Sequence, residues 1–146
     1  YARKGLSWSK FEEHTKLFKD NITTVSSVIN IYSISSMPDL ILWCKRNKIH
    51  FYGTTQSEPP HQKVTCLPKE SKQQMIAMYK KFVNEYSSIL TFEDLQQIKH
   101  WLSYMTSSDD SNLLNDFKVE TERLDSLRRE SFIDTFPEFA TWYTNL

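Results

Sequence analysis

A succession of strand, helix and strand near the start of the chain constrains its fold more than any other feature. Residues 22–34, ITTVSSVINIYSI, are rich in β-branched side chains that partly alternate with polar ones, which is typical of a strand. Pro38 then opens a helix with Leu40 and Trp43 on its apolar face, and residues 49–53 form a second, shorter strand. A helix between two strands usually joins them in parallel through a right-handed crossover. The sequence therefore predicts an α/β fold.

Two strands are too few to form a protected sheet. An isolated parallel pair exposes the backbone groups of both outer edges. We therefore expect the sheet to be completed by the remainder of a larger polypeptide or by a protein partner. The chain begins with Tyr1 and not with Met, so we expect it to be a fragment, a processed form or the ordered part of something longer.

The remaining segments are predicted to be mainly helical. Ser7 is placed to cap a helix over residues 8–20, and the proline-containing residues 54–68 form a long loop across the end of the sheet. Apolar residues recur with helical period after Pro68, after Thr91 and over residues 113–129. In the helix after Thr91, the residues expected to face inward are Phe92, Leu95, Ile98, Trp101, Leu102 and Met105. The aromatic tail that closes the chain should be packed down and not frayed.

Composition excludes several classes of function. Lys plus Arg and Asp plus Glu both number 18, so no overall charge attracts nucleic acid, and this partner is disfavoured. Gly5 and Gly53 are the two glycines of the chain, which rules out a glycine-rich phosphate-binding loop. No apolar run approaches the roughly 20 residues that span a bilayer. We expect a soluble, cytoplasmic protein without a membrane partner.

No constellation of residues predicts catalysis or a metal site in this chain alone. Zinc sites need His and Cys at short spacings, whereas the histidines are scattered at His14, His50, His61 and His100. The paired carboxylates lie beside many Lys and Arg residues, so solvated faces explain them better than acid–base catalysis. Cys44 and Cys66 are expected to be free thiols.

Polar side chains within the two predicted strands form the best candidate site. A parallel strand buried on both faces is normally almost continuous in Val, Ile and Leu, and polar residues interrupt this pattern here. Ligand sites of α/β sheets lie at the carboxyl ends of the strands. The candidate cofactor-binding or cavity-lining residues are Asn30, Tyr32, His50, Tyr52 and Thr54. The alternative is that neighbouring backbone groups satisfy these side chains.

Three segments carry a resemblance to a known family: YARKGLSW at the start, CLPKESK at residues 66–72, and RLDSLRRESFIDTFPEF at residues 123–139. Together they resemble the carboxy-terminal part of radical SAM proteins of marine phages and bacteria. Residues 25–43 look like a late strand–helix unit of the family's partial (βα) barrel, and IHFYGTT at residues 49–55 looks like the final barrel strand. The resemblance implies that residues 1–67 are distal βα-barrel units. Residues 68–146 would then be a helical carboxy-terminal extension of three to four helices, packed on them as one structural unit.

The resemblance also implies a location for the candidate residues and a cofactor. Asn30 and Tyr32 would point toward the cofactor or substrate cavity, with His50 and Tyr52 close to it. The CxxxCxxC loop that holds the family's iron–sulfur cluster is absent from this chain. We therefore expect no cofactor in this chain, and S-adenosylmethionine with a four-iron cluster only in a complete parent protein.

Two functions follow from these observations. The first is that of the carboxy-terminal portion of a radical SAM-like enzyme, which forms cavity wall and substrate-side surface and is not catalytic alone. The alternative is a non-enzymatic phage protein–protein interaction module, which would act in the host cytoplasm. A small nucleic-acid-binding domain is a third and weaker possibility, because the charge is balanced.

Overall fold

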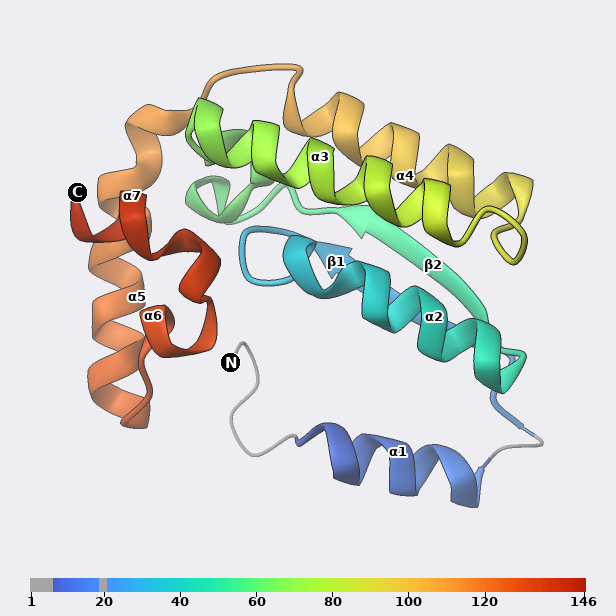
Figure 1. Cartoon of the computed structure of the whole chain (residues 1–146). Helices are drawn as coiled ribbons and strands as arrows, with labels where there is room; N and C mark the ends of the chain where they lie inside the picture. Colours follow the sequence, from blue (N-terminus) through green and yellow to red (C-terminus); the bar gives the residue numbers. More distant parts are fainter. Residues whose placement is uncertain (1–6, 19–20) are drawn as a thin grey trace.

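The computed structural model describes residues 7–18 and 21–146 (Figure 1). Its helices and strands are, in chain order, α1 (Trp8–Leu17), β1 (Thr24–Ile29), α2 (Met37–Asn47), β2 (His50–Thr55), α3 (Lys69–Glu85), α4 (Phe92–Met105), α5 (Leu114–Arg128), α6 (Phe132–Thr135) and α7 (Ala140–Thr144). The predicted fold class is confirmed: the protein is α/β, with two parallel strands followed by a helical extension. The extension has three long helices and two short ones.

The two strands form one parallel sheet with one covered face and one bare face. Their register runs from Thr24 opposite His50 to Ile29 opposite Thr55. Because successive side chains of a strand point to opposite faces, burial alternates along the strands. Ile29 and Phe51 are buried in the core with residues of α2, α3 and α4. The exposed side chains of the other face are Thr24, Ser26, Val28, His50, Tyr52 and Thr54.

Among the described residues, no other strand pairs with the outer edge of β1. In a parallel pair alternate residues bond the neighbouring strand, and the backbone carbonyls of Thr23 and Ile29 accept from β2 and the residue after it. The backbone groups of Thr24, Ser26 and Val28 therefore face away from β2. Ser33 covers the last outward carbonyl, because its hydroxyl donates to the carbonyl of Val28 at 2.7 Å. The predicted open edge is thus present at β1, from Thr24 to the N–H of Val28, and it ends where the Ser33 hydroxyl binds the Val28 carbonyl.

Local capping explains where several helices begin and end. The hydroxyl of Ser7 accepts from the N–H of Lys10 at the start of α1, as predicted. This helix ends at Leu17, and residues 19 and 20 of the predicted segment lie outside the described residues. α2 ends at Asn47, and the φ of its C-cap residue Lys48 is left-handed at 58°, so the backbone turns sharply into β2.

α1 lies alongside α2 (Figure 1). The indole N–H of Trp43 in α2 donates to the carboxylate of Glu12 in α1 at 2.9 Å. The rings of Trp8 and Phe11 lie 5.4 and 5.2 Å from the ring of Trp43. Aromatic pairs at such separations add to the apolar area that they bury. These contacts hold α1 against α2.

The helical extension is anchored to the turn that follows β1. The phenol of Tyr79 in α3 donates to the carbonyl of Ile34 at 2.8 Å, and the ring of Tyr32 lies 5.2 Å from the ring of Phe117 in α5. The chain end packs there as predicted, since Phe132, Phe139 and Tyr143 are buried. In Figure 1 the helices α5, α6 and α7 gather at one end of the sheet.

The segment from residue 56 to residue 68 crosses the carboxyl end of the sheet. It contains two short 3₁₀ turns, and Val64, Cys66 and Leu67 within it are fully buried. The N–H of Ile31 donates to the carbonyl of Gln62 at 3.0 Å, which ties the segment to the residues after β1. The segment therefore contributes Val64, Cys66 and Leu67 to the hydrophobic core. In the described parts of the chain no helix has both the length and the apolar character needed to cross a membrane.

Candidate functional site

Three of the five predicted site residues share the bare face of β2. His50, Tyr52 and Thr54 alternate with the buried residues of this strand and are exposed, Tyr52 to 51%. Ser26 and Val28 of β1 lie opposite Tyr52 and Thr54. The face therefore presents hydroxyl and imidazole groups around a half-exposed aromatic ring. Such a surface can donate and accept hydrogen bonds and stack on a planar group.

Side chains of α4 close the outer edge of β2, which the sequence analysis expected to be open. The N–H of Gly53 donates to the amide oxygen of Gln97 at 2.8 Å, and the amide nitrogen of Gln97 donates to the carbonyl of Phe51 at 3.2 Å. The indole N–H of Trp101 donates to the carbonyl of Gly53 at 3.3 Å. These bonds replace those of a neighbouring strand. A strand cannot be added at this edge unless α4 moves away.

Gly53 allows α4 to approach the strand this closely. A Cβ atom at this position would lie 3.0 Å from Cε2 of Trp101 and 3.2 Å from Cδ1 of Ile29. Both separations are shorter than the normal contact between carbon atoms. The glycine is therefore required by the close packing of the Trp101 ring over β2.

A shallow pocket of about 360 Å³ joins the bare face to the closed edge of β2. Tyr52 and Thr54 line it together with Gln96 and His100 of α4. His100 was counted among the scattered histidines that predict no metal site, and it lies beside two predicted site residues. The structure thus brings Tyr52 and Thr54 together and adds a titratable group from α4.

Asn30 lies at the carboxyl end of β1, one residue beyond the strand. Its amide nitrogen donates to the side-chain oxygen of Gln56 at 2.6 Å, and the amide nitrogen of Gln56 donates to Gln62 at 2.9 Å. The side-chain oxygen of Asn30 is buried and lacks a hydrogen-bond partner in the described residues. A buried acceptor without a hydrogen bond costs free energy. This oxygen is therefore the group at the end of the sheet that most clearly calls for a donor.

Tyr32 lies away from the bare face. The predicted strand extended past this residue, but β1 ends at Ile29, and Tyr32 packs among the aromatic residues of the chain end. Its hydroxyl is 3.0 Å from that of Thr121 in α5. Burial is the main cause that raises the pKa of the Tyr32 phenol. These contacts make Tyr32 a link between the sheet and the helical extension.

The described residues hold no arrangement typical of metal or nucleophilic chemistry. Within residues 7–18 and 21–146, no group of three His, Cys, Asp or Glu side chains is placed to bind a metal ion. Cys44 and Cys66 are free and fully buried, and burial is the main cause that raises the pKa of each thiol to about 11. Because the thiolate is the nucleophile, these thiols are inert at neutral pH.

We expect the native protein to resist iodoacetamide at pH 7.5 and to gain two carbamidomethyl groups in urea, measured by intact mass. Stability should also fall as the pH rises from about 9, the ordinary thiol pKa, to about 11, because the unfolded thiols lose protons that the folded ones keep. Urea unfolding at pH 8, 9 and 10 tests this slope. Rapid alkylation of the native protein, or stability that rises over this interval, would contradict it.

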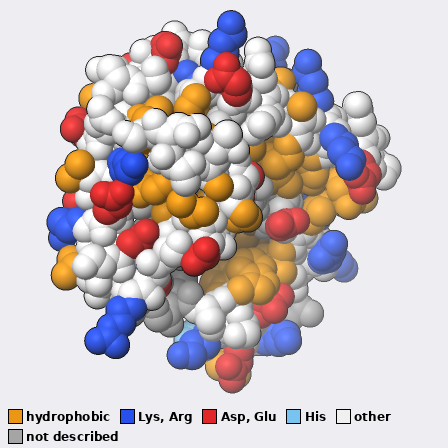
Figure 2. Space-filling view, turned by 60° about the vertical axis from the view of Figure 1, so that its left-hand side comes forward, with side chains coloured by type: hydrophobic (Ala, Val, Ile, Leu, Met, Phe, Trp, Pro, Cys, Tyr) orange, Lys and Arg blue, Asp and Glu red, His pale blue; other side chains and the backbone are white. Residues whose placement is uncertain are grey.

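Charge is mixed on the face of the molecule that Figure 2 shows. Figure 2 shows Lys and Arg side chains interspersed with Asp and Glu on the face that carries the end of the chain. A nucleic-acid site usually concentrates positive charge on one face. This face shows no such concentration, and the weak expectation for nucleic acid stays a prediction from the balanced composition.

Comparisons with known proteins return no relative. No protein-family model matches the chain, and neither does any curated protein or solved structure.

Proposed function

We propose that this chain forms the distal strands and closing helices of a radical SAM-like barrel, and that the bare face of its sheet is part of the cavity wall. The arrangement of the two faces carries this proposal. In a (βα) barrel the helices lie outside, and the opposite side chains of the strands point inward. Here the helices pack against Ile29 and Phe51, whereas Tyr52 and Thr54 are exposed on the other face.

The difference between the two sheet edges supports the same proposal. A terminal strand of an open barrel needs cover on one edge only, because its other edge bonds the preceding strand. β2 has such cover in Gln97 and Trp101 of α4. The edge of β1 is open between Thr24 and Val28, where a preceding strand would bond. In this arrangement β2 is the last strand and β1 is the one before it.

The role of this chain within the barrel is to bind and to position. The hydroxyls of Tyr52 and Thr54 and the imidazole of His100 offer hydrogen bonds at the pocket beside β2. S-adenosylmethionine and a four-iron cluster would belong to the complete protein, since a CxxxCxxC loop is absent from these 146 residues. Electron transfer and bond cleavage would take place on the part of the complete protein that carries the CxxxCxxC loop.

The coding sequence upstream of Tyr1 tests the proposal, and we expect a CxxxCxxC loop in the same reading frame. Anaerobic reconstitution with iron and sulfide should then colour the longer polypeptide brown and leave this chain colourless. In the longer polypeptide, Tyr52→Ala should weaken S-adenosylmethionine or substrate binding about tenfold, roughly 1.4 kcal/mol. Phe92→Ala is the matched control, because Phe92 is a 75% exposed ring of α4 that lies outside this pocket.

Three results would contradict the proposal. A start codon directly before Tyr1 would mean that no CxxxCxxC loop precedes this chain in the same polypeptide. A stable four-iron spectrum from this chain alone would show that the missing loop is not needed. Equal binding by the Tyr52→Ala and Phe92→Ala proteins would show that the bare face is not the cavity wall.

A protein–protein interaction module is the second candidate, and the exposed apolar side chains of α1 favour it. Leu17 is 71% exposed, and Phe18 and Trp8 are 56% and 50% exposed. Leu17 and its neighbour Phe18, the C-cap residue, lie together at the end of α1, and adjacent exposed apolar side chains are typical of a docking surface. A start codon directly before Tyr1 would favour this candidate over the barrel.

A further inference from the structure

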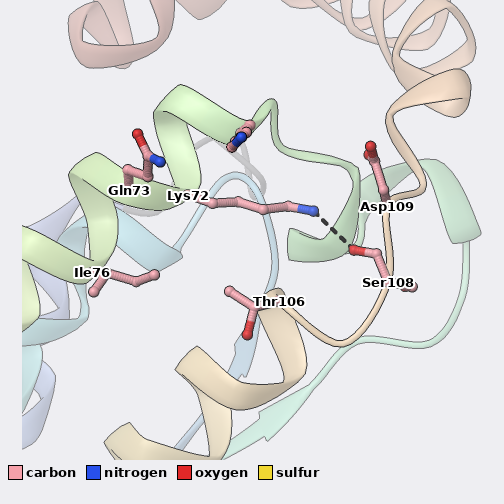
Figure 3. A pocket seen from close by; sticks show the side chains of 7 residues that line it. Lys72, Gln73, Ile76, Thr106, Ser108 and Asp109 are labelled. Atoms are coloured by element: carbon pink, nitrogen blue, oxygen red, sulfur yellow. Dashed lines mark hydrogen bonds between the residues drawn. The ribbon is translucent and has the colours of Figure 1, made fainter.

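A second pocket lies between the first turn of α3 and the turn that follows α4, far along the chain from the bare sheet face. Its volume is about 470 Å³. Lys69, Lys72 and Gln73 line it from α3, and Thr106, Ser108 and Asp109 line it from the opposite side. Figure 3 shows the Lys72 side chain stretched across from the helix to the turn.

Lys72 is a buried cation, since only 8% of it is exposed. Its ammonium donates to the backbone carbonyl of Ser108 at 2.9 Å. An ammonium has three donors, and no carboxylate in the described parts of the chain forms an ion pair with this one. A buried charge is normally paired, because the loss of hydration is costly. The pocket beside Lys72 is therefore suited to an anion.

The two carboxylates closest in the chain to Ser108 are engaged in their own turn. Asp109 accepts from the N–H of Ser111 at 3.2 Å, and Asp110 accepts from the hydroxyls of Thr65 and Ser108 at 2.6 and 3.0 Å. Hydrogen bonds from Ser111 and Thr65 are the main causes that lower the pKa of Asp109 and of Asp110, respectively. Both are ionised at neutral pH, so their two negative charges match the two positive charges of Lys69 and Lys72. Within the described residues, however, neither carboxylate forms an ion pair with the Lys72 ammonium.

The pocket lies beside the start of α3, because Lys69 is the first residue of this helix. This 17-residue helix begins after Pro68, and no side chain caps it. The N–H groups of its first turn have no partner within the helix, and they carry the positive end of the helix dipole. They lie next to Lys69 and Lys72, so the backbone and the side chains favour the same kind of ligand.

We propose that this pocket binds a phosphate group, with Lys72 as its central cation and with Lys69 and the first turn of α3 as further donors. The group is either free phosphate or the phosphate of a small organic ester. An ester would extend its organic part over the remainder of the pocket. This site does not depend on the proposed function of the sheet face.

Titration of the ¹⁵N-labelled chain with inorganic phosphate at pH 7 tests the proposal, with sodium chloride at equal ionic strength as reference. We expect saturable amide shifts confined to residues 69–73 and 106–110, with a Kd of about 1 mM or below. Glycerol phosphate is the second arm: tighter binding than phosphate identifies an ester, and weaker binding identifies the free ion.

Two variants give the titration its matched controls. Lys72→Met keeps the buried stem without the charge and should weaken phosphate binding at least tenfold, whereas Lys81→Met on the exposed side of α3 should not. Asp109→Asn removes a repulsive charge from an exposed residue and should tighten binding two- to threefold, whether or not the Lys72 variant folds. Shifts that do not saturate, or affinities unchanged in the Lys72→Met and Asp109→Asn proteins, would overturn the proposal.

Discussion

Replacing Phe132 with alanine is expected to lower the free energy of unfolding by about 3–5 kcal/mol. Phe132 is fully buried where α6 meets α5, and its ring lies 5.4 Å from Phe117 and 4.6 Å from Tyr143. Its ring also lies 6.0 Å from that of Tyr32, in the turn after β1. Truncation would remove the apolar area of the ring and leave a cavity that the surrounding rings cannot fill completely.

Urea unfolding followed by circular dichroism measures this loss. Val119→Ala in α5 is the matched control, since Val119 is 69% exposed and its truncation should change stability by less than about 0.5 kcal/mol. A loss below about 1 kcal/mol for Phe132→Ala would mean that the aromatic cluster of the chain end is not part of the cooperative core. A loss that is large by fluorescence and absent by circular dichroism would mean that α5, α6 and α7 unfold separately.

Local patterns predicted the elements well, because their causes lie within a few residues. The side chain of Ser7 caps α1 as predicted, and that of Thr91 caps α4, whose pattern was predicted to start after this residue. Each cap needs only the next turn of helix to act. The parallel pairing of β1 and β2 was also predicted correctly from the sequence, since a helix between two strands leaves few other topologies.

The end of β1 could not be read from the sequence. Ile31 and Tyr32 continue the apolar pattern of the strand, but they are buried because the residues after β1 pack against the loop at Gln62 and against α5. Those partners are about 30 and 90 residues away in the chain. Burial by distant segments and burial within a sheet give the same local pattern.

The closure of β2 was missed for a similar reason. Gln97, Trp101 and Tyr104 are spaced by four and three residues, so they share one face of α4, and this spacing was visible. Nothing local indicated that the face would meet a strand edge. Phe92 was wrongly expected to face inward: it is 75% exposed and lies about 200° around the helix from the buried Asp94.

Replacing Asp94 with alanine is expected to lower the free energy of unfolding by about 2–4 kcal/mol. Asp94 is 4% exposed and forms an ion pair with Lys45, so it connects α4 to α2. Its carboxylate also accepts from the N–H and the hydroxyl of Thr91 at 2.7 and 2.8 Å, which completes the capping box of α4. The substitution removes both interactions and leaves a partly buried ammonium without its partner.

Urea unfolding at several pH values separates this account from a simple packing defect, with Glu93→Ala on the exposed neighbouring residue as control. Burial acts to raise the pKa of Asp94, but hydrogen bonds from Lys45 and Thr91 outweigh it and hold the pKa below its ordinary 3.8. A lowered folded pKa stabilises the protein above 3.8, and this contribution is lost as the pH falls through the folded value. The difference between the native and Asp94→Ala proteins should therefore be full at pH 6 and shrink below pH 3.8. A difference that stays constant down to pH 3 would assign the loss to packing, because only the charged carboxylate can lose its partners by protonation.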